Sequence, residues 1–130
     1  MKDNEDKNIS KNASFWQSLN IAIFGIKTAI AEERNMRFHV FALIAVIIAG
    51  FIFQLSLNDW LWISLAIVLV IVCEMINSML ERVVDLIVGK QYDDQAKIIK
   101  DMAAGTVLIS AVFAIIVGVL IFGPKLLNLF

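Results

Sequence analysis

Long apolar stretches separated by short polar segments make up most of this chain. Residues 38–58 contain no Asp, Glu, Lys or Arg over 21 positions, and residues 102–124 contain none over 23. A helix that crosses a bilayer needs about 20 predominantly apolar residues. Each stretch is therefore long enough for one membrane-spanning helix, and we expect spans over about 38–57 and 102–123.

A third apolar pattern lies between these stretches, and charged residues interrupt its second half. Residues 60–73 carry no charge, and apolar positions then continue around Glu74, Glu81, Arg82 and Asp85. The apolar spacing stays helical through these interruptions. One long middle helix over about 59–87 is therefore expected.

The N-terminal part of the chain changes from polar to amphipathic. Residues 1–13 are polar and are expected to form a disordered tail. Apolar residues then recur at helical spacing, at Phe15, Leu19, Ile23, Ile26 and Ile30. This predicts an amphipathic helix over about 14–33 that lies on the membrane surface, the alternative being a helix packed on the bundle. Residues 14–130 would form a single all-α integral membrane domain.

Composition agrees with a membrane protein and removes several functional classes. Hydrophobic residues make up 60% of the chain, whereas average soluble domains lie near half. A formal net charge of -1 leaves no basic surface for nucleic acid. The single cysteine, Cys73, excludes an intrachain disulfide and a cysteine zinc site. Neither G-x-x-x-x-G-K-[ST] nor G-x-G-x-x-G occurs, so any nucleotide is not held by a P-loop or a Rossmann fold.

Basic residues are unevenly distributed among the connections between the expected spans. Six precede residue 38, none lies near 56–59, four lie between Arg82 and Lys100, and only Lys125 follows the last span. Cytoplasmic loops of membrane proteins carry the excess of Lys and Arg. The N-terminus and the second connection are therefore predicted to be cytoplasmic.

Five polar residues share one face of the middle helix. At 100° per residue they fall within an arc of about 100°; they are Glu74, Asn77, Ser78, Glu81 and Asp85. Carboxylates in a membrane helix are costly, so they usually face a bundle interior and mark function. A stripe that only joins helices is the alternative, although Asn and Ser suffice for that. With a rise of 1.5 Å per residue from Trp60, Glu74 lies about 21 Å along the helix and Glu81 near the cytoplasmic surface. Such a stripe suits a reaction between a membrane substrate and a cytosolic one.

Charged residues just outside the spans offer complementary chemistry. Glu33 and Glu81 could share a Mg²⁺ ion, which prefers oxygen ligands and often binds one or two carboxylates together with phosphates. Lys100 could neutralise phosphate, or it is an ordinary juxtamembrane lysine. Glu32 is interpreted as a solvated neighbour. His39, taken as an isolated residue, is interpreted as structural or interfacial.

Three sequence blocks resemble one known family. Residues 74–85, EMINSMLERVVD, resemble the pattern E-x-x-N-[ST]-x-x-E-x-x-V-D of the prokaryotic diacylglycerol kinase family. Residues 100–105, KDMAAG, resemble its K-D-x-x-[AS]-[AG] element, and residues 33–39, ERNMRFH, resemble its Gram-positive branch of undecaprenol kinases. The resemblance covers residues 15 to about 125. Some relatives carry Arg or Lys near the start of the surface helix, where this chain has Ser14 and Gln17.

The resemblance implies a homotrimer in the bacterial cell membrane that phosphorylates a lipid alcohol with ATP and Mg²⁺. Undecaprenol is the expected substrate, and diacylglycerol is the alternative. The resemblance assigns Glu74 as the proton acceptor and Glu33 and Glu81 as metal-bridging acids. By position, the ATP contacts are Glu33, Glu81, Tyr92, Lys100 and Asp101, the lipid contacts are Glu74, Asn35, Arg37 and His39, and the supporting polar residues are Asn77 and Asp85.

Two functions other than a kinase remain open at this point. The acidic stripe could line a small ion or proton pathway, and ATP consumption that depends on added lipid alcohol would distinguish a kinase from it. A structural assembly protein is the other alternative. Such a protein would tolerate Glu74→Gln and Glu81→Gln without loss of function.

Overall fold

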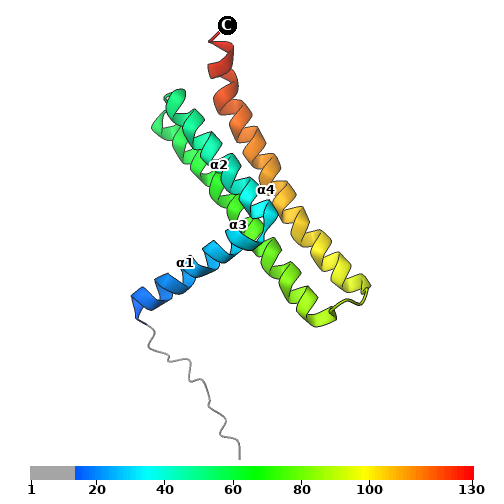
Figure 1. The fold of residues 1–130 in the computed structure, drawn as a ribbon. Coiled ribbons are helices and arrows are strands. Elements are labelled where there is room, and N and C mark those ends of the chain that lie inside the picture. The colour runs from blue at the N-terminus through cyan, green and yellow to red at the C-terminus, as the bar shows by residue number, and fades with distance from the viewer. Residues whose placement is uncertain (1–13) are drawn as a thin grey trace, which may run out of the picture.

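The computed structural model describes residues 14–130, which form four helices and no strand (Figure 1). They are α1 (Phe15–Glu32), α2 (Arg34–Ile52), α3 (Leu57–Val88) and α4 (Asp94–Leu127). The predicted all-α fold class is confirmed. The tail expected over residues 1–13 lies outside the described residues.

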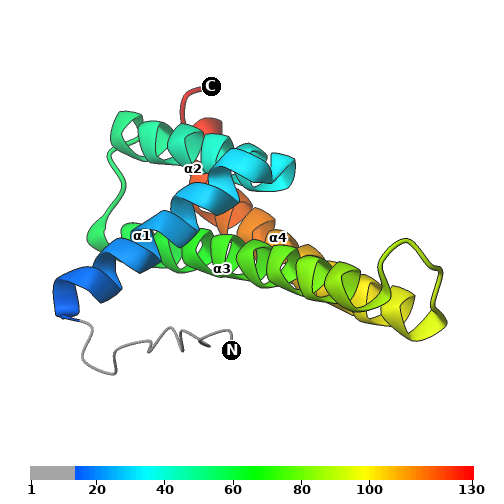
Figure 2. The same ribbon diagram turned by 60° about the horizontal axis from the view of Figure 1, so that its bottom comes forward.

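Three of the four helices are long and apolar enough to cross a membrane: α2, α3 and α4. The most extensive packing joins α3 to α4, and α2 packs on α3 (Figure 1 and Figure 2). In contrast, α1 contacts α2 and projects away from the bundle (Figure 1). This arrangement is a three-helix bundle with one helix set across it.

The helix α1 begins at a complete capping box. The Ser14 hydroxyl accepts a hydrogen bond from the backbone N–H of Gln17 at 3.3 Å, and the Gln17 side chain accepts one from the Ser14 N–H at 3.0 Å. Such reciprocal bonds satisfy N–H groups that a helix start leaves free. The two positions at which some relatives carry a basic residue therefore fix a helix end in this chain.

No residue of α1 is buried, and its large apolar side chains remain uncovered. Phe15, Trp16 and Phe24 are each at least 70% exposed. A helix that packed on the bundle would bury such side chains, so the structure gives no support to that alternative. Apolar side chains of this size suit the boundary between headgroups and acyl chains.

The end of α2 and the start of α3 differ from the expected boundary at residue 57. The helix α2 ends at Ile52, because Gln54 takes a φ of 51° and the N–H of Leu55 bonds to the Gly50 carbonyl at 3.1 Å. Ser56 and Asp59 then form a second capping box that starts α3. The expected span over 38–57 is thus shifted toward the N-terminus, whereas the expected middle helix over 59–87 agrees with α3 within two residues.

The helix α4 is longer than the expected span over 102–123 at both ends. It begins at Asp94, where the Asp93 carboxylate caps the helix by accepting from the Ala96 N–H at 2.8 Å, and it continues past Pro124 to Leu127. A count of uncharged residues finds only the apolar section of a helix. It misses the charged turns at the start of α4, where Lys97 forms an i,i+4 ion pair with Asp101.

The apolar core lies where the loop between α2 and α3 meets α4, and a glycine permits its closest contact. Leu55, Ile63 and Val117 are buried there. A Cβ atom added to Gly50 would lie 2.5 Å from Cη2 and 2.8 Å from Cζ2 of Trp60. The Trp60 indole therefore occupies the space that any side chain at residue 50 would need.

Gly50→Ala should lower the stability of the bundle, because the indole of Trp60 must move to admit a methyl group. Overpacking of this kind costs about 1–3 kcal/mol. Gly25→Ala is the matched control, since a Cβ there meets nothing within 4 Å and alanine favours a helix over glycine by about 0.5–1 kcal/mol. Thermal unfolding in detergent should give a lower Tm for Gly50→Ala alone. Equal Tm values for the two variants would contradict the close contact.

Candidate active site

The polar face of α3 passes from the interior of the bundle to its surface. Glu74, Asn77 and Ser78 are only 2%, 5% and 6% exposed. One turn further along, Glu81 is half-buried, and Asp85 is exposed. The five residues therefore follow the order from buried to solvated that their helical spacing predicts.

The buried carboxylate of Glu74 has a histidine beside it. Nε2 of His39, on α2, lies 3.8 Å from Oε2 of Glu74, and both side chains are largely buried. Asn35, one turn earlier on α2, also approaches this carboxylate. The sequence pattern alone predicts a structural or interfacial role for His39. The fold, however, brings its side chain next to Glu74, the candidate proton acceptor.

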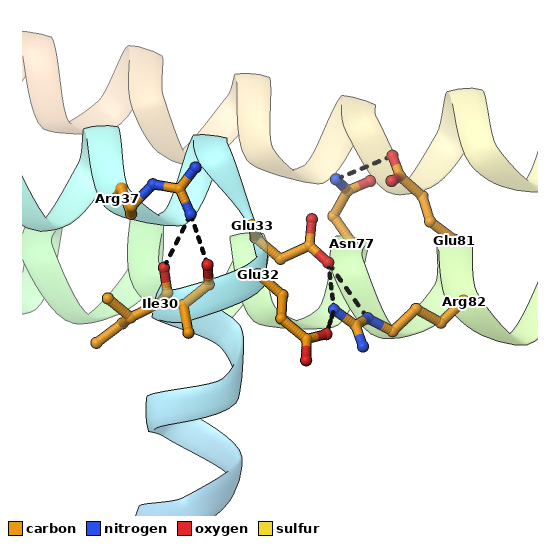
Figure 3. A network of polar contacts seen from close by, with 8 residues as sticks. Ile30, Glu32, Glu33, Arg37, Asn77, Glu81 and Arg82 are labelled. Carbon is orange, nitrogen blue, oxygen red and sulfur yellow. Dashed lines mark hydrogen bonds and ion pairs between the residues drawn. The ribbon is translucent and has the colours of Figure 1, made fainter.

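The junction of α1 and α2 brings a pair of acids against α3. Glu33 ends α1 and begins α2, and its Oε1 accepts from Nη2 of Arg82 at 2.7 Å and from Nε at 3.2 Å (Figure 3). Oε2 of Glu32 also lies 2.7 Å from Nη2 of Arg82. Glu32 is therefore an ion-pair partner of Arg82, and its side chain, 56% exposed, remains the solvated neighbour that the sequence predicts.

Asn77 and Glu81 lie next to this junction (Figure 3). Nδ2 of Asn77 donates to Oε1 of Glu81 at 3.4 Å. Oδ1 of Asn77 is buried and has no hydrogen-bond partner within residues 14–130. Since most buried polar atoms are hydrogen-bonded, this oxygen is available to a donor or a cation.

The carboxylate oxygens of Glu33 and Glu81 are of the kind that Mg²⁺ prefers as ligands. Both carboxylates lie on the side of Asn77, whose buried Oδ1 adds an oxygen with no hydrogen-bond partner in the described residues. Within the described part of the chain, no three His, Cys, Asp or Glu residues form a metal-binding group. Oxygen atoms of phosphate and water would therefore have to complete the coordination, as is common for Mg²⁺.

A second polar region surrounds the loop between α3 and α4. A hollow of about 470 Å³ is lined there by Asp85, Tyr92, Lys100 and Asp101, among others. Nζ of Lys100 donates to Asp85, and Asp101 accepts from Lys97. Four of the predicted site residues are thus brought together, although neither Glu33 nor Glu81 lines this hollow.

Arg37 lies apart from the other predicted lipid contacts. Its Nη1 donates to the carbonyl oxygens of Ala31 at 2.8 Å and Ile30 at 3.3 Å, the last turn of α1 (Figure 3). A cation at this position satisfies carbonyls that a helix end leaves free. In this structure Nη1 of Arg37 therefore caps the end of α1.

An apolar groove of about 440 Å³ lies between α2, α3 and α4, with His39 among its lining residues. Its walls include Ala42 and Leu43 from α2, Ile67 and Val70 from α3, and Ala114 and Gly118 from α4. His39 is thus shared by the apolar groove and the carboxylate of Glu74.

Comparison with known proteins agrees with this arrangement. The family model described as prokaryotic diacylglycerol kinase matches residues 20–122. A diacylglycerol kinase of Synechocystis is 41% identical over 98% of this chain and 76% of its own length. An undecaprenol kinase of Bacillus subtilis is 43% identical over 86% of this chain and 90% of its own length. A diacylglycerol kinase of Helicobacter pylori is 34% identical over 68% of this chain and 69% of its own length.

The family match covers most of the described residues and all three sequence blocks noted above. It also agrees with the three helices that are long and apolar enough to cross a membrane. The chain therefore belongs to the prokaryotic diacylglycerol kinase family and is a membrane-bound lipid kinase.

Proposed function

We propose that this protein is an undecaprenol kinase, which transfers the γ-phosphoryl group of ATP to the hydroxyl of undecaprenol in a Mg²⁺-dependent reaction. The observation that carries the proposal is the buried carboxylate of Glu74 beside His39, where the apolar groove meets the polar face of α3. A lipid tail would lie in the apolar groove, and its hydroxyl would then meet the carboxylate beside His39. The Bacillus subtilis relative supports undecaprenol, and the Synechocystis relative supports diacylglycerol as the alternative.

In the proposed mechanism Glu74 is the general base. A lipid hydroxyl is a weak nucleophile, so a group within hydrogen-bond reach has to take its proton. The alcohol oxygen attacks the γ-phosphorus, the bond to the β–γ bridging oxygen breaks, and the proton passes to Glu74. His39 would orient the carboxylate from the side of α2. Most of the remaining rate enhancement comes from positioning.

The residues on the cytoplasmic side would hold the nucleotide. Glu33 and Glu81 would bind the Mg²⁺ ion, which offsets charge on the transferring phosphoryl group when it is bound. Lys100 would exchange its partner Asp85 for a phosphate oxygen, and Tyr92 and Asp101 would contact the rest of the nucleotide. The hollow that Tyr92, Lys100 and Asp101 line supports this placement.

The two candidate lipids differ in the hydrogen-bond donors that they need near Glu74. Diacylglycerol carries two ester carbonyls that need hydrogen-bond donors, whereas a polyprenol carries none. Asn35 and His39 lie at the carboxylate, whereas Nη1 of Arg37, the third source of donors, bonds to carbonyl oxygens of α1. A buried acceptor left unpaired costs about 1–3 kcal/mol.

The orientation and the oligomeric state are part of the proposal. The basic residues before α2 and between α3 and α4 support a cytoplasmic N-terminus in a bacterial plasma membrane. Small exposed residues outside the groove, such as Ala45 on α2 and Ala104 on α4, would permit close approach of a neighbouring helix. Together with the resemblance to the family, they support a homotrimer.

Glu74→Gln should retain the fold and lose phosphoryl transfer, because the amide is nearly isosteric but cannot accept the proton. Removal of a general base typically costs about 10²-fold or more. Ser110→Ala is the matched control: this buried hydroxyl bonds only within its own helix, to the Val107 carbonyl. Steady-state rates of lipid phosphorylation on purified protein provide the measurement. Near-normal activity of Glu74→Gln would defeat the assignment.

Glu33→Gln and Glu81→Gln should each raise the Mg²⁺ concentration needed for half-maximal activity, because each removes a carboxylate ligand. Asp94→Asn serves as the control, since Asp94 is an exposed acid in the first turn of α4. Activity would be titrated with Mg²⁺ at fixed ATP. If both variants give the same curve as wild type, the two acids have another role.

Undecaprenol should give a higher kcat/KM than diacylglycerol, by about fivefold or more if one ester is left unpaired. Both lipids would be compared in the same bilayer with one enzyme preparation. A clear preference for diacylglycerol would overturn the undecaprenol assignment. It would leave the lipid kinase activity and the role of Glu74 intact.

A further inference from the structure

Arg82 joins two acids that neighbour each other in sequence, and neither the sequence blocks nor the proposed mechanism gives it a role. Its Nη2 contacts both Oε1 of Glu33 and Oε2 of Glu32 at 2.7 Å, and its Nε donates to the same Glu33 oxygen at 3.2 Å. The planar guanidinium is suited to such simultaneous contacts. Arg82 thus ties the α1–α2 junction to α3 across 49 positions of sequence.

The Arg82 guanidinium donates to only one of the two carboxylate oxygens of Glu33. Both bonds from Arg82 end on Oε1. In Figure 3 the other oxygen is turned away from Arg82, toward the side on which Asn77 and Glu81 lie. A carboxylate held by one oxygen in this way presents the second in a fixed direction.

Glu32 balances the charge that this arrangement brings to the site. Two carboxylates face one guanidinium, so a net negative charge remains at the junction. Without Glu32, the positive charge of Arg82 would cancel the attraction of Glu33 for a cation. With Glu32 in place, Arg82 can orient Glu33 without removing its capacity to bind a divalent ion.

We propose that Arg82, supported by Glu32, is a positioning residue that orients the Glu33 carboxylate toward a divalent cation shared with Glu81. The proposal rests on the proposed function for the identity of the metal ligands. Carboxylates that bind metals are usually held by hydrogen bonds from a second layer of residues, and loss of such a partner typically lowers metal affinity by about 10–100-fold. Because Arg82 is 46% exposed, the lower end of this range is expected.

The test is Mn²⁺ binding to the nucleotide-free protein, followed as the loss of the free Mn²⁺ signal in electron paramagnetic resonance. Arg82→Gln should weaken binding by about tenfold, and Glu33→Gln should weaken it at least as much. Arg82→Lys, which keeps the charge but loses the fork of N–H donors, should fall between Arg82→Gln and wild type. Arg34→Gln is the matched control: Arg34 lies next to Glu33 and is exposed, and it forms no ion pair within the described residues.

The outcomes separate this inference from the proposed function. Tighter Mn²⁺ binding by Arg82→Gln would overturn the inference, because Arg82 would then compete with the metal. Wild-type binding by Arg82→Gln and Arg82→Lys, together with weak binding by Glu33→Gln, would also overturn it while leaving Glu33 as a ligand. Unchanged binding by Glu33→Gln would contradict the metal assignment itself. If Arg82→Gln does not fold, as judged by circular dichroism, Arg82→Lys and Glu32→Gln give the same comparison, and wild-type binding by both would overturn the inference.

Discussion

A carboxylate buried inside an apolar helix bundle is the constraint that orders the rest of this structure. Glu74 is 2% exposed at a depth where α2, α3 and α4 pack together. Charge in such surroundings is costly unless polar groups accompany it. The accompanying groups are His39 and Asn35 from α2 and the remaining polar face of α3. The position of α2 against α3 thus determines whether Glu74 has partners at all.

The helices α3 and α4 extend beyond their apolar sections, and this extension connects the buried Glu74 carboxylate to water. The polar face of α3 runs from Glu74 to exposed Asp85, and α4 begins with a charged turn that carries Lys97 and Lys100. Three basic side chains in this region are each paired with an acid. They are Arg82, Lys97 and Lys100. In the proposed mechanism a phosphate that reaches Lys100 finds a cation already held in place by Asp85, a partner that the phosphate can replace.

Much of this architecture could be predicted from the sequence because it depends on local periodicity. The α-helical spacing of Glu74, Asn77, Ser78 and Glu81 fixes a common face, whatever the helix packs against. The middle helix was predicted within two residues for the same reason. The ends of α2 and α4 were not, since they depend on the turn at Gln54 and on the cap at Asp93.

Contacts between distant segments could not be predicted, because no local pattern encodes them. Arg82 and Glu33 are 49 positions apart, and each is an ordinary charged residue in its own context. Arg37 belongs to a sequence block that resembles lipid-binding residues of the family, yet its Nη1 donates to carbonyl oxygens at the end of α1. The proximity of His39 to Glu74 also appears only when α2 is packed on α3.

The central claim is that a lipid alcohol reaches Glu74 through the apolar groove beside His39. The most direct measurement is photoaffinity labelling of the wild-type protein with a short polyprenol whose diazirine group is close to the hydroxyl, with the labelled residues identified by mass spectrometry. The account predicts labels on groove residues near His39, such as Ala42, Leu43 and Val70, and their loss when excess undecaprenol competes. Labels confined to α1 or to the outward face of α4, unaffected by undecaprenol, would contradict it.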